Sequence, residues 1–289
     1  MKKIRTLFLP LLSVAIIAIT VAAGSSKSST SSTDTRTIIT ELFKSIDNAK
    51  TLTYNMVYSE RLDDGKIHRD SNSVKYQKMP LKIYIKTAEN VEILWPVAED
   101  ITSAWVHPSS FPYITLKLDP DGSIMRKNQH HGVQSTGYEY FGSVLKQAAS
   151  KAGADFDSRF IYLGEVDYNG IKCHKLNVIE PGFTYVPYKV LEGETVLTIA
   201  AKLKLSEYMI LTHNKLSSYT SVDNGQTIMI PTSYAKAMTL YINESSMLPL
   251  LIKVEDDRGQ FEQYYFKNVK TNVFLSDYDF SKKNKDYNF

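Results

Sequence analysis

The chain of 289 residues is long enough for one or two domains with cores of their own, and 43% hydrophobic with 22% charged residues is an ordinary globular composition. Lys and Arg outnumber Asp and Glu by 34 to 31, but Lys2, Lys3 and Arg5 all lie in the first 23 residues. Without that segment the formal charge is zero, which argues against nucleic acid as a partner. The single cysteine, Cys173, excludes an intrachain disulfide.

The first 23 residues are typical of an export signal. Three basic residues precede an uncharged apolar run, and small residues such as Ala23 offer a cleavage site before Gly24. An uncleaved signal would instead anchor the chain in the membrane, because the apolar run approaches the length that spans a bilayer. Either route predicts a location in the periplasm or cell envelope. Residues 24–33, rich in Ser and Thr, are expected to form a flexible linker.

Residues 34–50 predict an amphipathic helix, since Ile38, Leu42 and Ile46 recur at helical spacing. From residue 52 onward the apolar period changes to two, with turn signals such as Asn169-Gly170 between the runs. A second helix is expected over residues 137–153. The pattern predicts an α+β fold in which one large curved antiparallel sheet, of about eight to eleven strands, carries helices on one face.

A helix pair interrupts the strand pattern. Thr195 and Ser206 stand as N-caps before two short apolar helices, and strand-like segments flank the pair. The stretches "PYKVLEGETVLTIAAKLKLSEYMILTHNKL" and "NGQTIMIP" together resemble a LysM domain, the small βααβ module of cell-wall proteins, over residues 187–232. Two positions depart from the family pattern: Glu194 stands where Asp is usual, and Asn224 replaces the Pro that usually precedes Gly-Gln.

The resemblance to LysM domains implies binding of N-acetylglucosamine-containing glycan, such as peptidoglycan. In that family the glycan lies between the loop after the first strand and the loop after the second helix. The implied glycan-binding residues are Gly193, Glu194, Thr195, Val196, Lys215, Leu216 and Ser217. The alternative is that Gly193 and Thr195 only turn and cap the helix and that Leu216 belongs to the core, and both roles can coexist.

The rest of the chain resembles secreted bacterial domains of unknown function related in shape to the lipoprotein carrier LolA. The resemblance rests on the order of one helix and then a strand meander, and on "SIMRKNQHHGVQSTGYEYFG" and "MLPLLIKVEDDRGQFEQYYFKNVKTNVFL". It implies an open half-barrel, here discontinuous over residues 34–181 and 235–289, with the LysM module replacing a hairpin turn. Such carriers hold acyl chains in the concave face, although the same apolar faces also suit an ordinary core. An insertion of this kind predicts that the half-barrel folds without residues 184–234.

An enzymatic role is not expected. His130 and His131 are adjacent, so in a strand they would point to opposite faces and in a helix about 100° apart, which is unsuited to one metal. We expect this pair to cap a helix or to have another structural role, with a metal or catalytic role as the alternative. No H-E-x-x-H or G-x-S-x-G pattern occurs. The sequence therefore predicts no catalytic residue, no metal site and no cofactor.

Three classes of function follow. The first, and the one that the sequence favours, is a cell-envelope protein that binds peptidoglycan through the LysM module while the half-barrel acts as a scaffold or binding module. The second is a periplasmic lipid or lipoprotein carrier tethered to the wall, with an acyl chain in the half-barrel. The third is a cell-wall hydrolase.

Overall fold

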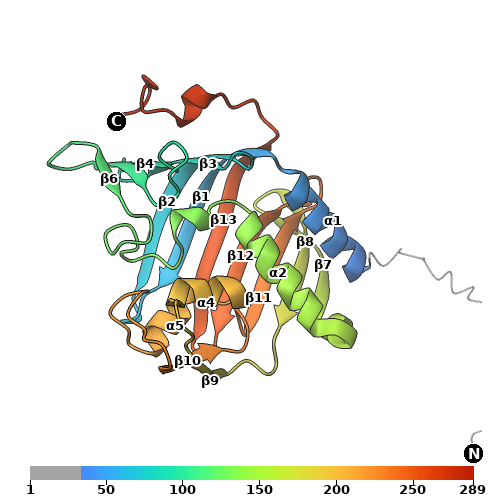
Figure 1. The fold of residues 1–289 in the computed structure, drawn as a ribbon. Helices are drawn as coiled ribbons and strands as arrows, with labels where there is room; N and C mark the ends of the chain where they lie inside the picture. The colour runs from blue at the N-terminus through green and yellow to red at the C-terminus, as the bar shows by residue number, and fades with distance from the viewer. Residues whose placement is uncertain (1–33) are drawn as a thin grey trace, which may run out of the picture. The chain divides into compact units, whose positions relative to one another are not determined.

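The computed structural model describes residues 34–289, which form one compact unit (Figure 1). The expected signal (residues 1–23) and linker (residues 24–33) lie outside the described residues. Among the helices of residues 34–289, none has the length and apolar character needed to cross a bilayer.

One antiparallel sheet of eleven strands dominates the described residues and confirms the predicted α+β class. Its strand order is β6-β5-β4-β3-β2-β1-β13-β12-β11-β8-β7. The strands are β1 (Thr51–Arg61), β2 (Ile67–Gln77), β3 (Lys82–Thr87), β4 (Glu92–Trp95), β5 (Ala104–His107), β6 (Leu116–Leu118), β7 (Phe160–Tyr168), β8 (Ile171–Ile179), β11 (Ala237–Asn243), β12 (Pro249–Asp256) and β13 (Gly259–Thr271).

Helices cover one face of this sheet (Figure 1). Helix α1 (Thr35–Asn48) begins after Asp34, whose side chain accepts the Arg36 N–H, and its buried stripe is the predicted one. Helix α2 (Glu139–Ala152) ends, as predicted, at Gly153, which adopts a φ of 50°. The short helices are α3 (Phe156–Arg159), η1 (Val133–Ser135), η2 (Gly153–Asp155) and η3 (Asp277–Phe280).

The inserted module has the predicted βααβ order: β9 (Tyr185–Lys189), α4 (Val196–Leu203), α5 (Glu207–His213) and β10 (Thr227–Pro231). Thr195 and Thr198 form a reciprocal capping box at the start of α4, and the Ser206 hydroxyl accepts the Met209 N–H at the start of α5. The module has a small apolar core of its own, formed by Val190, Val196, Ile199, Ala200, Leu205, Ile210, Tyr219, Ile228 and Ile230.

The module is inserted between two paired strands. β8 and β11 pair antiparallel from Ile179–Ala237 to Cys173–Asn243, which is the pairing expected across the insertion. Beyond them the Glu180 N–H donates to the Lys236 carbonyl at 2.9 Å, so the chain leaves and re-enters the sheet at neighbouring positions. The half-barrel is therefore discontinuous in sequence and continuous in its hydrogen-bonded ladder.

Candidate functional site

Two carboxylates face each other where β1 and β13 approach the module. Glu60 and Glu262 are direct partners in the sheet register, and their residues are 3% and 0% exposed. Like charges opposite one another destabilise a sheet, and buried charges require compensating partners. The surroundings of this pair must therefore supply hydrogen-bond donors and positive charge.

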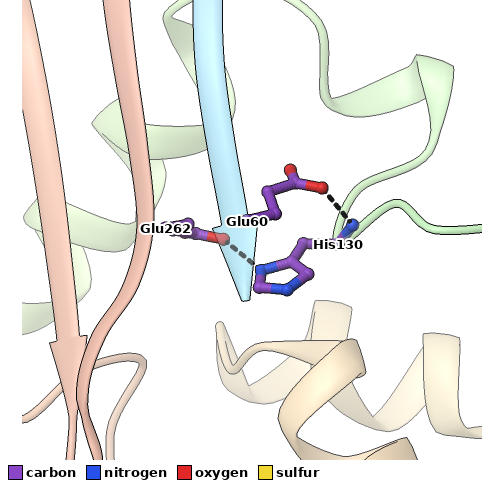
Figure 2. A group of neighbouring side chains, drawn as sticks. All are labelled: Glu60, His130 and Glu262. Carbon is purple, nitrogen blue, oxygen red and sulfur yellow. Dashed lines mark hydrogen bonds and ion pairs between the residues drawn. The ribbon is translucent and has the colours of Figure 1, made fainter. Parts of the chain in front are cut away.

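Both adjacent histidines donate to this pair. His130 Nδ1 lies 2.9 Å from one oxygen of Glu262, and the His130 backbone N–H donates to Glu60 at 2.9 Å (Figure 2). His131 Nε2 lies 3.1 Å from the same oxygen of Glu262. Two tyrosine hydroxyls complete the set: Tyr264 donates to Glu60 and Tyr234 donates to Glu262, each at 2.5 Å. The two acidic groups are thus satisfied by ring N–H, backbone N–H and phenol donors together.

The placement of the histidines corrects one expectation from the sequence. They lie in a bend before η1, not in a strand or a helix, so the two rings converge on one carboxylate instead of pointing apart. Neither caps a helix. The His130 ring is held in the core between Tyr208 and Phe261, with centroid distances of 4.2 and 4.1 Å. Its Nε2 donates to the Arg61 carbonyl at 3.0 Å, which gives this side chain a structural role.

The same geometry can be tested as a metal site. Donor atoms of Glu60, His130 and Glu262 all lie within 4.8 Å of one another. Each residue is buried, however, and His130 uses both ring nitrogens in hydrogen bonds to protein oxygens. A metal would have to displace the proton between His130 and Glu262, so the residues fit a hydrogen-bonded network better than a metal centre.

The LysM module closes this network from the other side. Glu207, the first residue of α5, is buried and accepts from Arg126 Nη2 at 3.0 Å, while His131 Nδ1 lies 3.8 Å away. The next residue, Tyr208, belongs to the apolar core of the sheet, and its hydroxyl accepts the Asp63 N–H at 3.0 Å. The module is therefore docked on the half-barrel through buried charged and aromatic groups. We call this contact, formed by Arg126, His131, Glu207, Tyr208 and Glu262, the joint.

The pKa values of this joint show that its charges are mutually stabilised. Burial alone would raise the pKa of Glu207, but the nearby charges of His131 and Arg126 lower it to about 2. Burial alone would lower the pKa of His131, but the charges of Glu262 and Glu207 and the hydrogen bond to Glu262 raise it to about 10. At neutral pH the joint therefore holds ionised carboxylates against a protonated histidine and an arginine.

A small cavity lies beside the network on the concave face of the sheet. Its volume is about 90 Å³, with Glu60, His131 and Tyr264 at its polar side and residues such as Met56, Ile93 and Phe141 at its apolar side. An engineered apolar cavity that binds benzene measures about 150 Å³. The cavity beside the network is therefore smaller than a site that holds one small apolar molecule.

The predicted glycan-binding residues are brought together on the module surface. The Val196 N–H donates to the Tyr219 carbonyl at 2.9 Å and joins the two loops. Gly193, Lys215 and Ser217 are exposed, while Glu194, Thr195 and Leu216 are half-buried. The Val196 side chain is 0% exposed and belongs to the module core, so it is not available to a glycan in this structure.

Glu194, the residue that departs from the family pattern, is held inside the turn. Its carboxylate accepts the Leu191 N–H at 3.0 Å, the Tyr188 hydroxyl at 2.9 Å and the Lys202 ammonium at 3.1 Å. The Leu191 hydrogen bond is the main cause that lowers the pKa of this carboxyl. The Glu194 side chain, longer than the Asp that is usual in the family, therefore stabilises the loop through these hydrogen bonds. Gly193 beside it is exposed.

Sequence reasoning missed Glu60, Arg126, Glu207 and Glu262. One signal was present for Glu262: it shares the inward face of β13 with Tyr264 and Phe266, where an apolar residue is expected. Nothing local distinguishes Arg126 or Glu207. These two residues bind each other across 81 residues of sequence.

Comparison with known proteins finds two family matches along the chain. Residues 188–231 match the LysM domain, and residues 49–188 match a family described as "Protein of unknown function (DUF1571)". The chain thus combines a LysM domain with a domain of a family of unknown function. Among curated proteins, none matches this chain.

The similar solved structures are remote. A LolA superfamily protein from Nitrosomonas europaea is 10% identical with a TM-score of 0.31, covering 86% of this chain and 97% of that one. Lipoprotein LppX from Mycobacterium tuberculosis is 10% identical with a TM-score of 0.38, covering 84% and 98%. The Pseudomonas aeruginosa MucA/MucB complex is 10% identical with a TM-score of 0.40, covering 86% of this chain but only 60% of the matched chain. Scores of this size assign no function.

Proposed function

We propose that this is a non-enzymatic cell-envelope protein that holds N-acetylglucosamine-containing glycan of the wall through its LysM domain. The observation that supports this most directly is the LysM match over residues 188–231, together with two loops joined by the Val196–Tyr219 hydrogen bond and open to solvent at Gly193, Lys215 and Ser217. Because this glycan belongs to the cell wall, the proposal also places the protein in the cell envelope.

The chemistry of the sugar suits such a surface. Each acetamide offers one donor, one acceptor and a methyl group, so exposed loop backbone and one apolar side chain can hold it without charge. Gly193 and Ser217 supply backbone groups, and the half-buried Leu216 supplies the apolar contact. A single module makes few contacts, so we expect a Kd on the order of 10 μM to 1 mM, with retention coming from the high local concentration of glycan.

The half-barrel is best explained as a rigid support for this module. The cavity of about 90 Å³ beside the buried network offers little room for an acyl chain at that end of the sheet. The buried joint fixes the LysM domain on the half-barrel instead of leaving it mobile on a linker.

Co-sedimentation of the protein with insoluble peptidoglycan tests the proposal. Ser217→Trp places a bulky side chain on an exposed loop position and should abolish retention without a change in thermal unfolding. Ser109→Trp is the matched control, because Ser109 is exposed in the turn between β5 and β6 and lies outside the LysM module. This variant should sediment like the native protein. Undiminished retention of Ser217→Trp would place glycan binding elsewhere.

A further inference from the structure

We infer that the groove between helix α4 and the half-barrel binds the peptide that branches from the wall glycan, so that the protein recognises peptidoglycan over peptide-free glycan. The inference rests on the proposed function, which supplies the glycan contact. The groove has a volume of about 310 Å³, within the range of ligand sites. Both parts of the molecule line it, with Leu197, Ala201 and Lys204 on one side and Asp121, Gln134 and Tyr140 on the other.

The groove begins next to the two loops of the proposed glycan surface. Leu197 directly follows Val196, which closes the first loop. Arg126, a residue of the groove, lies 4.5 Å from the ring of Tyr219, the residue that closes the second loop. A branch leaving a sugar held by these loops would therefore enter the groove directly.

The length of the groove fits a short peptide. Leu197, Ala201 and Lys204 lie on one face of α4 and its C-cap. The seven residues from Leu197 to Lys204 correspond to a rise of about 10 Å along the helix. An extended peptide spans about 3.3 Å per residue, so this face accommodates about three residues. The short peptides of bacterial walls are of this size.

The charges of the groove suit a zwitterionic occupant. Wall peptides carry free carboxylates and the amine of a diamino acid. Lys204 and Asp121 line the groove with opposite signs, and Gln134 donates to Asp121 at 3.0 Å. Arg126 and Glu207 also belong to the lining, but they are buried and paired with each other at 3.0 Å, so their charges offset each other. A carboxylate of the peptide would lie near Lys204, and the amine near Asp121.

The joint makes this groove a permanent feature of the surface. Glu207 lies in the lining and is fixed by Arg126, and Tyr208 is packed in the sheet core. Because neither wall of the groove has to be ordered on binding, little conformational entropy is lost. A LysM domain on a free linker would have no such second wall.

The test compares three insoluble probes with the full chain: intact peptidoglycan, the same peptidoglycan stripped of its peptides by an amidase, and chitin. The native protein should bind intact peptidoglycan about tenfold more tightly than the stripped material, the equivalent of one charge-assisted hydrogen bond. Ala201→Trp, at an exposed position of α4, should lose this preference and keep its affinity for stripped glycan. Ser150→Trp, exposed on α2 outside the groove, is the matched control.

Lys204→Glu is a second variant that changes charge without adding bulk, and it should also reduce binding to intact peptidoglycan alone. Equal affinity of the native protein for intact and stripped material, or unchanged preference in both variants, overturns the role of the groove while leaving the proposed function standing. Failure of the native protein to bind any of the three probes overturns the proposed function and this inference with it.

Discussion

The concave face of the sheet is closed by two different kinds of packing. Under α1 and α2 it is closed by apolar side chains, among them Ile38, Leu42 and Ile46 of α1 and Val144 and Leu145 of α2. Where the module docks, it is closed by Glu60, Glu262, His130, His131 and Glu207. Apolar packing tolerates small shifts, whereas a buried network of charges requires every partner. We call the region under α1 and α2 the apolar end of the concave face and the region where the module docks its polar end. The polar end therefore specifies how the LysM domain is oriented.

The largest effect is expected from removing the module. Deleting residues 184–234 and joining the ends with a short Gly-rich turn removes Glu207 from Arg126 and Tyr208 from the His130 ring. The sequence predicts that the half-barrel still folds without these residues, and the buried contacts of Glu207 and Tyr208 add that its stability is lower. We expect the free energy of unfolding to fall by about 3–5 kcal/mol or more, because buried charges lose their partners.

Urea titration followed by circular dichroism measures this loss. The same titration in the presence and absence of salt separates a packing defect from a charge defect, since newly exposed charges are screened. A midpoint equal to that of the native protein would mean that the module contributes no stability to the half-barrel.

Glu262→Ala tests the polar end directly. It removes the acceptor of His130, His131 and Tyr234, and should lower the free energy of unfolding by about 3–5 kcal/mol. Glu255→Ala, a half-exposed carboxylate on the neighbouring strand, is the control and should cost about 1 kcal/mol or less. Equal urea midpoints for the two variants would contradict a structural role for the network.

Leu42→Ala is the matching change at the apolar end. Leu42 is 0% exposed, and its truncation should cost about 2–5 kcal/mol through lost burial and a residual cavity. Leu163→Ala, 45% exposed on β7, serves as its control. We expect peptidoglycan binding to persist in Leu42→Ala at temperatures where it is folded, because the joint is untouched. Loss of binding by the folded variant would show that the apolar packing under α1 affects the docked LysM module.

The pH dependence of stability should come from the buried charged groups Glu207 and His131. The pKa of His131 rises from 6.5 to about 10 on folding, so its contribution is complete below pH 6.5 and is lost as the pH rises towards 10. The pKa of Glu207 falls from 4.5 to about 2, so its contribution is complete above pH 4.5 and is lost as the pH falls towards 2. These two groups therefore stabilise the fold most between pH 4.5 and 6.5.

Urea midpoints of the native protein at pH 5.5, 7.5 and 9.5 should decrease in that order, and the decrease should be reduced in His131→Gln. His68→Gln, in β2, is the control and should keep the native slope. A native midpoint that rises with pH over this range would contradict the protonated state assigned to His131.

The sequence by itself determined the elements whose signals are local. The apolar stripe of α1, the stop at Gly153 and the caps at Thr195 and Ser206 each depend on residues within one or two turns. The resemblance to LysM domains, carried by residues of one short stretch, implied the module and its two loops, and the strand-like segments on either side predicted its position between β8 and β11.

Only the tertiary structure decided the polar joint and the groove beside it. Glu262 meets His130 across 132 residues, and Arg126 meets Glu207 across 81. The strand alternation marks Glu262 as a polar residue on an inward face, but no sequence pattern indicates which distant residue becomes its partner. The adjacent histidines illustrate the limit: strand and helix geometry both separate their rings, and only the bend imposed by the surrounding chain turns both towards Glu262.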